Sequence, residues 1–266
     1  MSYDGGAYHG WQIQPNGTSV EEVIESRLSL LIGRPTDIVG AGRTDTGVNA
    51  SMMMAHFDCD TLPGKFAEGK CNTTGDSTQS EETASASFCM WLSERLNRML
   101  PPDISVQWVR RVRDDAHARF SALSRTYHYY ICHTKSPFRR AYTCRIDRNL
   151  DYDAMNAACK ELFKYIDFTS FSKLHTDTKT NNCTIMEAKW TREDDDCWKF
   201  TIKANRFLRN MVRAIVGTLV DVGLGKLDIE GFRHVIEGKN RCKAGMSMPG
   251  NALFLADIEY PEDIYA

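Results

Sequence analysis

Strand-like and helix-like segments alternate along the whole chain, and this alternation constrains the fold more than any other feature. Aromatic and β-branched residues predict strands at residues 38–41, 52–57, 104–108, 126–132, 184–191, 198–203 and 252–260. Several of these strands are separated only by short turns. Such turns connect antiparallel strands, whereas parallel strands need a crossover of about a dozen residues or more. The pattern therefore predicts an α/β (α+β) fold with a mainly antiparallel sheet covered by helices.

Five segments have the apolar periodicity of helices that pack on such a sheet, namely residues 18–33, 88–100, 152–165, 205–222 and 229–237. The first of them begins with a capping box formed by Ser19 and Glu22. Residues 72–87 contain eight Ser or Thr and no large apolar side chain, which predicts an exposed loop. We place the boundary between an N-terminal half (1–120) and a C-terminal half (121–266) near residues 119–125.

Composition narrows the class of protein. No apolar run approaches the roughly 20 residues that cross a bilayer, and no signal peptide is recognised at the N-terminus. The nine cysteines are odd in number and none are spaced C-x-x-C, so we expect reduced thiols in the cytoplasm rather than disulfides or structural zinc. The net charge is only −2, but residues 110–148 carry ten Lys or Arg against three acids. Such basic stretches suit phosphate backbones, although they are also compatible with solvated faces.

A turn with the sequence GRTDTG at residues 42–47 follows the apolar segment 38–41. Its glycines permit a tight backbone path and close approach of a ligand. The turn would hold the Arg43 cation and the Asp45 carboxylate at fixed positions. Alternatively, Asp45 only bonds its own turn, as Asp often does.

Two further segments combine cations with apolar or aromatic residues. Arg206, Arg209 and Arg213 are spaced to share one face of the predicted helix 205–222, where each would need an anion, either a carboxylate or a phosphate. The alternative is a solvated basic edge. The sequence SRTYHYY at 124–130 interleaves aromatics with Arg and would suit base stacking beside phosphate contacts, or simply fill a core.

These segments together resemble the tRNA pseudouridine synthases of the A type. The similar motifs are YDG at 3–5 with YHGWQIQ at 8–14, GRTD at 42–45, DFTSF at 167–171, FLRNMVRAIVGTL at 207–219, and RCKAG at 241–245 with PGNAL at 249–253. They occur in order over nearly the whole chain. The resemblance implies two α/β halves around an extended sheet with a basic cleft, and a homodimer that binds tRNA. It implies uridines 38 to 40 of the anticodon stem-loop as substrates, with no cofactor or metal.

The resemblance also implies roles for individual residues. Asp45 would be the catalytic nucleophile and Arg213 its ion-pair partner, since a nearby cation offsets the desolvation of a carboxylate. Tyr127 would stack on the target base and take part in proton transfer at C5, Arg43 would help to extrude the nucleotide, and Leu253 would pack against the uracil. Arg206 and Arg209 would bind the substrate. Attack at ribose C1′, a glycal route and addition at uracil C6 all remain open.

The sequence departs from the family pattern at three places. Only two residues precede the YDG motif, so we expect a short first strand. Asn49 replaces a usual His, and the sequence MSM at 246–248 replaces small residues; both changes are candidates for altered RNA contacts. Two other functions stay open at this point. One is an RNA-binding protein without turnover, and the other is a glycoside-processing enzyme, which would need a second catalytic carboxylate.

Overall fold

One large sheet organises the molecule. The computed structural model describes residues 1–59, 77–173 and 179–265, without the side chains of 77–84. The sheet has eight strands, in the order β5-β1-β3-β10-β6-β9-β8, with β7 beside β6. They are β1 (Ser2–Tyr3), β3 (Asn49–Ala50), β5 (Ile104–Ser105), β6 (Ser124–Cys132), β7 (Cys144–Arg145), β8 (Ile185–Arg192), β9 (Cys197–Ala204) and β10 (Leu253–Glu259). β10–β3 and β6–β7 pair in parallel and the other named pairs are antiparallel, which confirms the predicted fold class.

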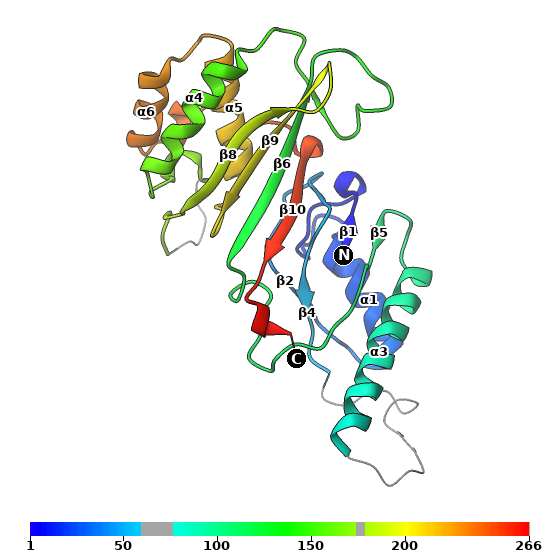
Figure 1. The fold of residues 1–266 in the computed structure, drawn as a ribbon. Helices are drawn as coiled ribbons and strands as arrows, with labels where there is room; N and C mark the ends of the chain where they lie inside the picture. Colours follow the sequence, from blue (N-terminus) through cyan, green and yellow to red (C-terminus); the bar gives the residue numbers. More distant parts are fainter. Residues whose placement is uncertain (60–76, 174–178, 266) are drawn as a thin grey trace.

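The last strand of the chain lies at the centre of this sheet (Figure 1). β10 pairs in parallel with β3, where Leu255 is opposite Ala50, and antiparallel with β6, where Leu253 is opposite Tyr129. β10 therefore joins strands from the two ends of the sequence. The short strands β2 (Val39–Gly40) and β4 (Ala55–His56) form a separate antiparallel pair.

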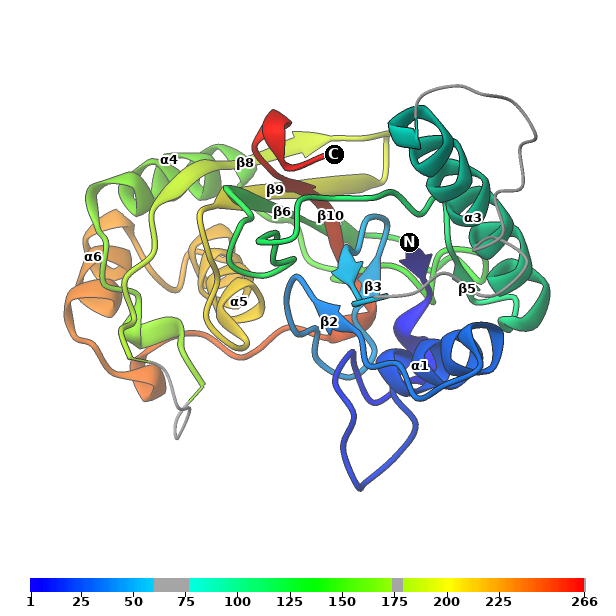
Figure 2. The same cartoon turned by 90° about the horizontal axis from the view of Figure 1, so that it is seen from below.

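The helices pack in two groups around two hydrophobic cores. The helices α1 (Val20–Ile32) and α3 (Ser77–Met99) lie with the N-terminal strands, and α4 (Tyr152–Glu161), α5 (Met211–Gly223) and α6 (Ile229–Glu237) lie with the C-terminal strands (Figure 2). One core gathers Leu28, Leu92 and other residues of the first group, and the other gathers Met155, Phe200 and Phe232. Leu255 and Ile258 of β10 belong to the first core, so the C-terminal strand completes the N-terminal half.

Local signals set several of these boundaries as predicted. The capping box of α1 is present, with the Ser19 hydroxyl accepting from the Glu22 amide at 3.2 Å. Gly33 ends this helix with a φ of 85°, a left-handed conformation that glycine adopts without steric cost. Helix α6 has the predicted bounds, and Asp228 accepts a hydrogen bond from the Gly231 amide at its start. None of the described helices combines the length and apolar character that a membrane crossing requires.

Several predicted element boundaries were wrong in part. The predicted loop 72–87 is helical from Ser77 onward, as the first turns of α3, while residues 72–76 lie outside the described ranges. Once a helix such as the predicted 88–100 exists, each added residue gains a hydrogen bond without a new nucleus, so polar turns can extend it. The predicted strand 104–108 is regular only over Ile104–Ser105.

The predicted helix 205–222 begins six residues late, at Met211. Asn210 has a left-handed backbone with a φ of 66°, which interrupts a right-handed helix. Its side-chain amide donates to the Ser247 hydroxyl at 2.6 Å, and Asn205 is bonded to Thr184 before β8. Tertiary contacts therefore hold residues 205–210 outside the helix. Arg206 and Arg209 consequently do not share a helical face with Arg213.

Candidate active site

The loop that carries Asp45 rests on the N-terminal segment of the chain. The Trp11 amide donates to the Thr44 carbonyl at 3.2 Å, and the Tyr3 and Thr44 hydroxyls share a hydrogen bond of 2.8 Å. Gly10 has a φ of 88°, and a Cβ there would lie 2.4 Å from the Thr44 oxygen. Only glycine allows this approach, so the first motif of the sequence supports the second.

The Asp45 carboxylate faces two guanidinium groups. Its Oδ2 lies 3.3 Å from an Nη of Arg213, and its Oδ1 lies 3.6 Å from the Nε of Arg209. The Asp45 and Arg213 side chains are 24% and 21% exposed, whereas Arg209 is 59% exposed. Among the described residues, the polar partners of this carboxylate are these arginines and not its own turn, and no second carboxylate joins them. The arrangement disfavours both the self-capping turn and the glycoside-processing site.

Backbone groups in the segment before β10 hold Arg213 in position. Its Nε donates to the Met248 carbonyl at 2.5 Å, and the Met248 amide donates to the Arg213 carbonyl at 3.2 Å. Helix α5 can approach this segment because residue 217 is glycine; a Cβ on Gly217 would lie 1.9 Å from the Met246 oxygen. The sequence departure at 246–248 therefore supports the ion pair through its backbone, and Met248 is buried.

Tyr127 of β6 lies close to this ion pair. Its ring meets Phe207 edge-to-face at 5.1 Å between ring centroids. Burial raises the pKa of the Tyr127 phenol to about 12, the Arg125 charge opposes that rise, and the Asp45 charge adds to it. Leu253 is buried in the same hydrophobic core that Tyr127 borders.

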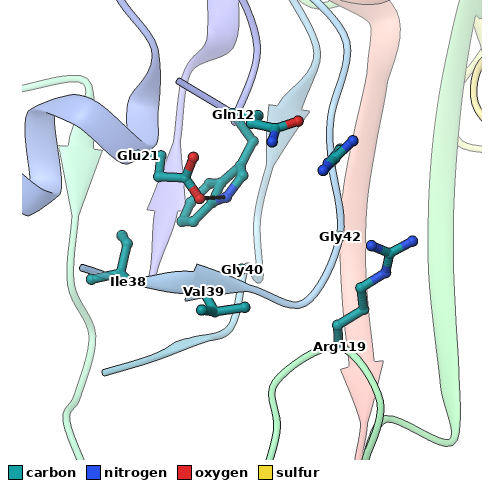
Figure 3. Close-up of a pocket in the computed structure, with 9 residues that line it drawn as sticks. Gln12, Glu21, Ile38, Val39, Gly40, Gly42 and Arg119 are labelled. Carbon is teal, nitrogen blue, oxygen red and sulfur yellow. Dashed lines mark hydrogen bonds between the residues drawn. The ribbon is translucent and has the colours of Figure 1, made fainter. Parts of the chain in front are cut away.

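Four of the predicted site residues therefore come together, namely Asp45, Arg209, Arg213 and Tyr127. The other two arginines lie elsewhere. Arg206 is half-buried and near Cys183 and Arg125. Burial raises the pKa of the Cys183 thiol to about 11, and the Arg206 charge opposes that rise. Burial lowers the pKa of Arg125, and the Arg206 charge adds to that shift. Arg43 is exposed and lines a hollow with Trp11, Gln12 and Arg119, outside the Asp45 ion pair (Figure 3).

Two residues hold the site together in ways that the sequence did not reveal. Arg125 donates to the carbonyls of Ala41 and Asn205, each at 3.0 Å, and also to those of Ala122 and Arg119. It thereby ties the start of the Asp45 loop to the segment before α5. In the sequence, Arg125 is recognisable only as an arginine within an aromatic strand. Its partners are backbone carbonyls, which every residue has, so the sequence does not indicate which ones it contacts.

Asn49 is the second such residue. It is buried, its amide oxygen accepts from the Gly5 amide at 2.8 Å, and its amide nitrogen donates to the Asn251 carbonyl at 2.8 Å. Both ends of the side chain thus bond to backbone groups. Asn49 therefore supports the junction of β3 with β10, and its effect on RNA contacts stays a prediction.

The donor groups near Asp45 are not arranged for a metal ion. Across the part of the chain that the structure describes, no three His, Cys, Asp or Glu side chains form a group that could hold one. The partners of Asp45 are cations, which would repel a metal ion. The site instead presents one carboxylate, oriented by two arginines, beside a partly buried aromatic ring.

The chain is similar to known proteins over nearly its whole length. A family model described as tRNA pseudouridine synthase matches residues 158–261. Two proteins named tRNA pseudouridine synthase A, from Bacteroides thetaiotaomicron and Bacteroides fragilis, are each 54% identical to the whole chain, which covers 91% and 96% of their lengths. A third of the same name, from Acetivibrio thermocellus, is 34% identical over 98% of the chain and 97% of its own length. Because these relatives match the whole chain, including the loop that carries Asp45 and the central strand β10, this chain belongs to the tRNA pseudouridine synthase family.

Proposed function

We propose that this enzyme converts uridine to pseudouridine at positions 38, 39 and 40 in the anticodon stem-loop of tRNA, with Asp45 as the catalytic nucleophile. The observation that carries the proposal is the pairing of a single carboxylate with Arg213 and Arg209 beside Tyr127. The matching relatives carry the name of this activity.

The reaction is an isomerisation, so the atoms of the uridine are conserved. The bond between N1 and C1′ breaks, a bond between C5 and C1′ forms, the proton on C5 leaves, and N1 gains a proton. A carboxylate can divide this change into two easier steps through a covalent intermediate. Asp45 suits this task because Arg213 is itself fixed by Met248, which holds the carboxylate in one orientation. Attack at C1′, a glycal route and addition at C6 each begin with Asp45.

We propose that the Tyr127 ring stacks on the extruded base, which its position near Asp45 supports. Because its pKa is about 12, the phenol is protonated at neutral pH. Its proton-accepting role at C5 would therefore require the substrate to change its surroundings. We propose that Arg43 helps to extrude the nucleotide, that Leu253 packs against the uracil, and that Arg206 contacts the RNA backbone.

We also propose that the enzyme acts as a homodimer in the cytoplasm. A tRNA is long compared with a chain of 30.2 kDa. Two basic clefts related by a twofold axis would let one subunit hold the tRNA body while the other modifies the anticodon arm. Residues 1–120 would supply the catalytic loop, and residues 121–266 the arginines and the opposite wall.

Chemical mapping of pseudouridine tests the proposed function. Unmodified tRNAs with uridine at position 38, 39 or 40 are incubated with the protein, and every uridine is then scored. Conversion is expected at these three positions and at no uridine outside the anticodon stem-loop. Absence of conversion, or conversion confined to another arm, would reject the proposed function.

A further inference from the structure

A hollow of about 230 Å³ adjoins the Asp45 loop, and the ion pair does not use it. Its walls are Trp11, Gln12, Glu21, residues 38–40, Gly42, Arg43 and Arg119. In Figure 3 the Arg119 side chain extends from its own segment towards Gly42, and Gln12 lies on the other side of the hollow. The partners of Asp45 come from the segment 209–213, so the loop has a separate, second neighbourhood in the N-terminal half.

The charge on this hollow is positive. Arg43 and Arg119 are both exposed, and neither pairs with a carboxylate within the described ranges. The acid in the wall, Glu21, is already engaged, because its two oxygens accept from the Trp11 indole and the Ile13 amide, each at 2.9 Å. Two guanidinium groups without an acidic partner suit a phosphate, which arginine binds through charge-assisted hydrogen bonds.

Apolar surface lines part of the same hollow. Val39 is 40% exposed in its wall. Phe120, the residue after Arg119, is 76% exposed and is not among the lining residues, but the Arg119 guanidinium lies over its ring, 5.7 Å from the centroid. The Phe120 ring is held in place, since it lies 4.4 Å from the His117 ring and the His117 Nδ1 accepts from the Arg119 amide at 3.1 Å. A guanidinium that packs on an aromatic ring is held in position and offers a planar face to a nucleotide.

We propose that this hollow is a subsite for the nucleotide next to the target uridine. The phosphate lies between Arg43 and Arg119, the base packs against Val39, and the Gln12 amide reaches the base edge. The subsite rests on the proposed function and gives the enzyme a second contact with the RNA, beside the target uridine. Since residue 43 stands two residues before Asp45, binding here also fixes the Asp45 loop from the side opposite α5.

A double-mutant cycle between protein and RNA tests the subsite. A single neutral methylphosphonate linkage is moved through the phosphates flanking the target in an anticodon stem-loop RNA. With the wild-type protein, one linkage is expected to raise Kd about tenfold, the size of one charge-assisted contact. With Arg119→Ala, which should itself weaken binding and reduce the salt slope by about one, the same linkage should cost less than about twofold.

Two further variants separate the subsite from general electrostatics. Arg98→Ala removes an exposed charge on α3 and should leave the sensitive linkage as sensitive as in the wild type. Val39→Trp fills the hollow and should weaken RNA binding, whereas Val39→Thr keeps its volume and should not. Unchanged sensitivity at every linkage in Arg119→Ala, or unaltered binding by Val39→Trp, would overturn the subsite. Failure of the wild-type protein to form any pseudouridine would instead reject the proposed function.

Discussion

The Asp45 carboxylate is paired with Arg209 and Arg213, and Arg213 is in turn held by the Met248 carbonyl. Replacing Asp45 with Asn keeps the shape of the side chain but removes the nucleophile. We expect Asp45→Asn to abolish pseudouridine formation and to change the Kd for tRNA only a few-fold. The measurement is chemical mapping together with filter binding, and Asp153→Asn, an exposed acid on α4, is the matched control. Pseudouridine formed at the normal rate by Asp45→Asn would contradict the assignment.

Arg213 and Arg206 provide a comparison within one segment. Arg213 contacts both the Asp45 carboxylate and the Met248 carbonyl, whereas Arg206 lies near Cys183 and Arg125. Arg213→Ala should therefore lose most of the activity, because the carboxylate loses its closest ion-pair partner. Arg206→Ala should lose much less. Single-turnover rates at saturating tRNA measure both, and equal losses would indicate that the two arginines serve only to bind phosphate.

Tyr127 gives a prediction about pH. Burial raises its pKa from the ordinary tyrosine value of 10.0 to about 12 in the folded protein, so the unfolded chain releases this proton first. The stability linked to Tyr127 is therefore complete below about pH 10 and is lost as the pH rises towards 12. We expect Tyr127→Phe to lose less stability than the wild type between about pH 9 and about pH 11.5. Urea denaturation across this range measures the difference, and parallel curves would contradict it.

At the scale of elements, the Asp45 loop and the segment before α5 are joined by Arg125. Its guanidinium donates to carbonyls from three segments, a geometry that the single ammonium of lysine cannot reproduce. We expect Arg125→Lys to lower the free energy of unfolding by about 1–3 kcal/mol, the usual cost of unsatisfied buried polar groups. The rate should also fall while Kd for tRNA stays close to that of the wild type.

Urea denaturation and single-turnover kinetics check the Arg125 prediction. Arg111→Lys is the control, since Arg111 is exposed on the segment that leads to Arg119. A variant at Arg125 with normal stability and a normal rate would show that the carbonyls are satisfied without it.

The elements also show where sequence patterns suffice. Helix α6 was predicted to the residue because Asp228 caps it and its apolar face repeats regularly. The start of α5 was not, because Asn210 takes its left-handed backbone alongside a bond to Ser247, 37 residues away. Arg209 still reaches Asp45, although from a loop and not from the predicted helical face. The Asp45–Arg213 pair was expected from the resemblance and is present. The backbone contacts that orient these residues, such as those of Arg125 and Met248, are tertiary and were not predictable.

At the scale of the whole molecule, the central position of β10 couples the two halves. It pairs with β3 on one side and β6 on the other, and the Asn251 carbonyl just before it accepts from Asn49. A site assembled from residues 45 and 213 therefore depends on the last strand of the chain. The proposed halves, 1–120 and 121–266, therefore share β10 across their boundary.

The homodimer is the prediction that concerns the molecule as a whole. Asp45, Arg209, Arg213 and Tyr127 all come from one chain, so each subunit contains a complete set of these groups. If the second subunit only holds the tRNA body, a heterodimer of wild type with Asp45→Asn should keep about half of the activity of the wild-type dimer, from its one intact site. Two differently tagged copies, purified in tandem, would provide this species for single-turnover assays. Light scattering at the assay concentration should report a dimer. A fully active monomer would refute the dimer requirement, and an inactive heterodimer would show that the partner's Asp45 is needed as well.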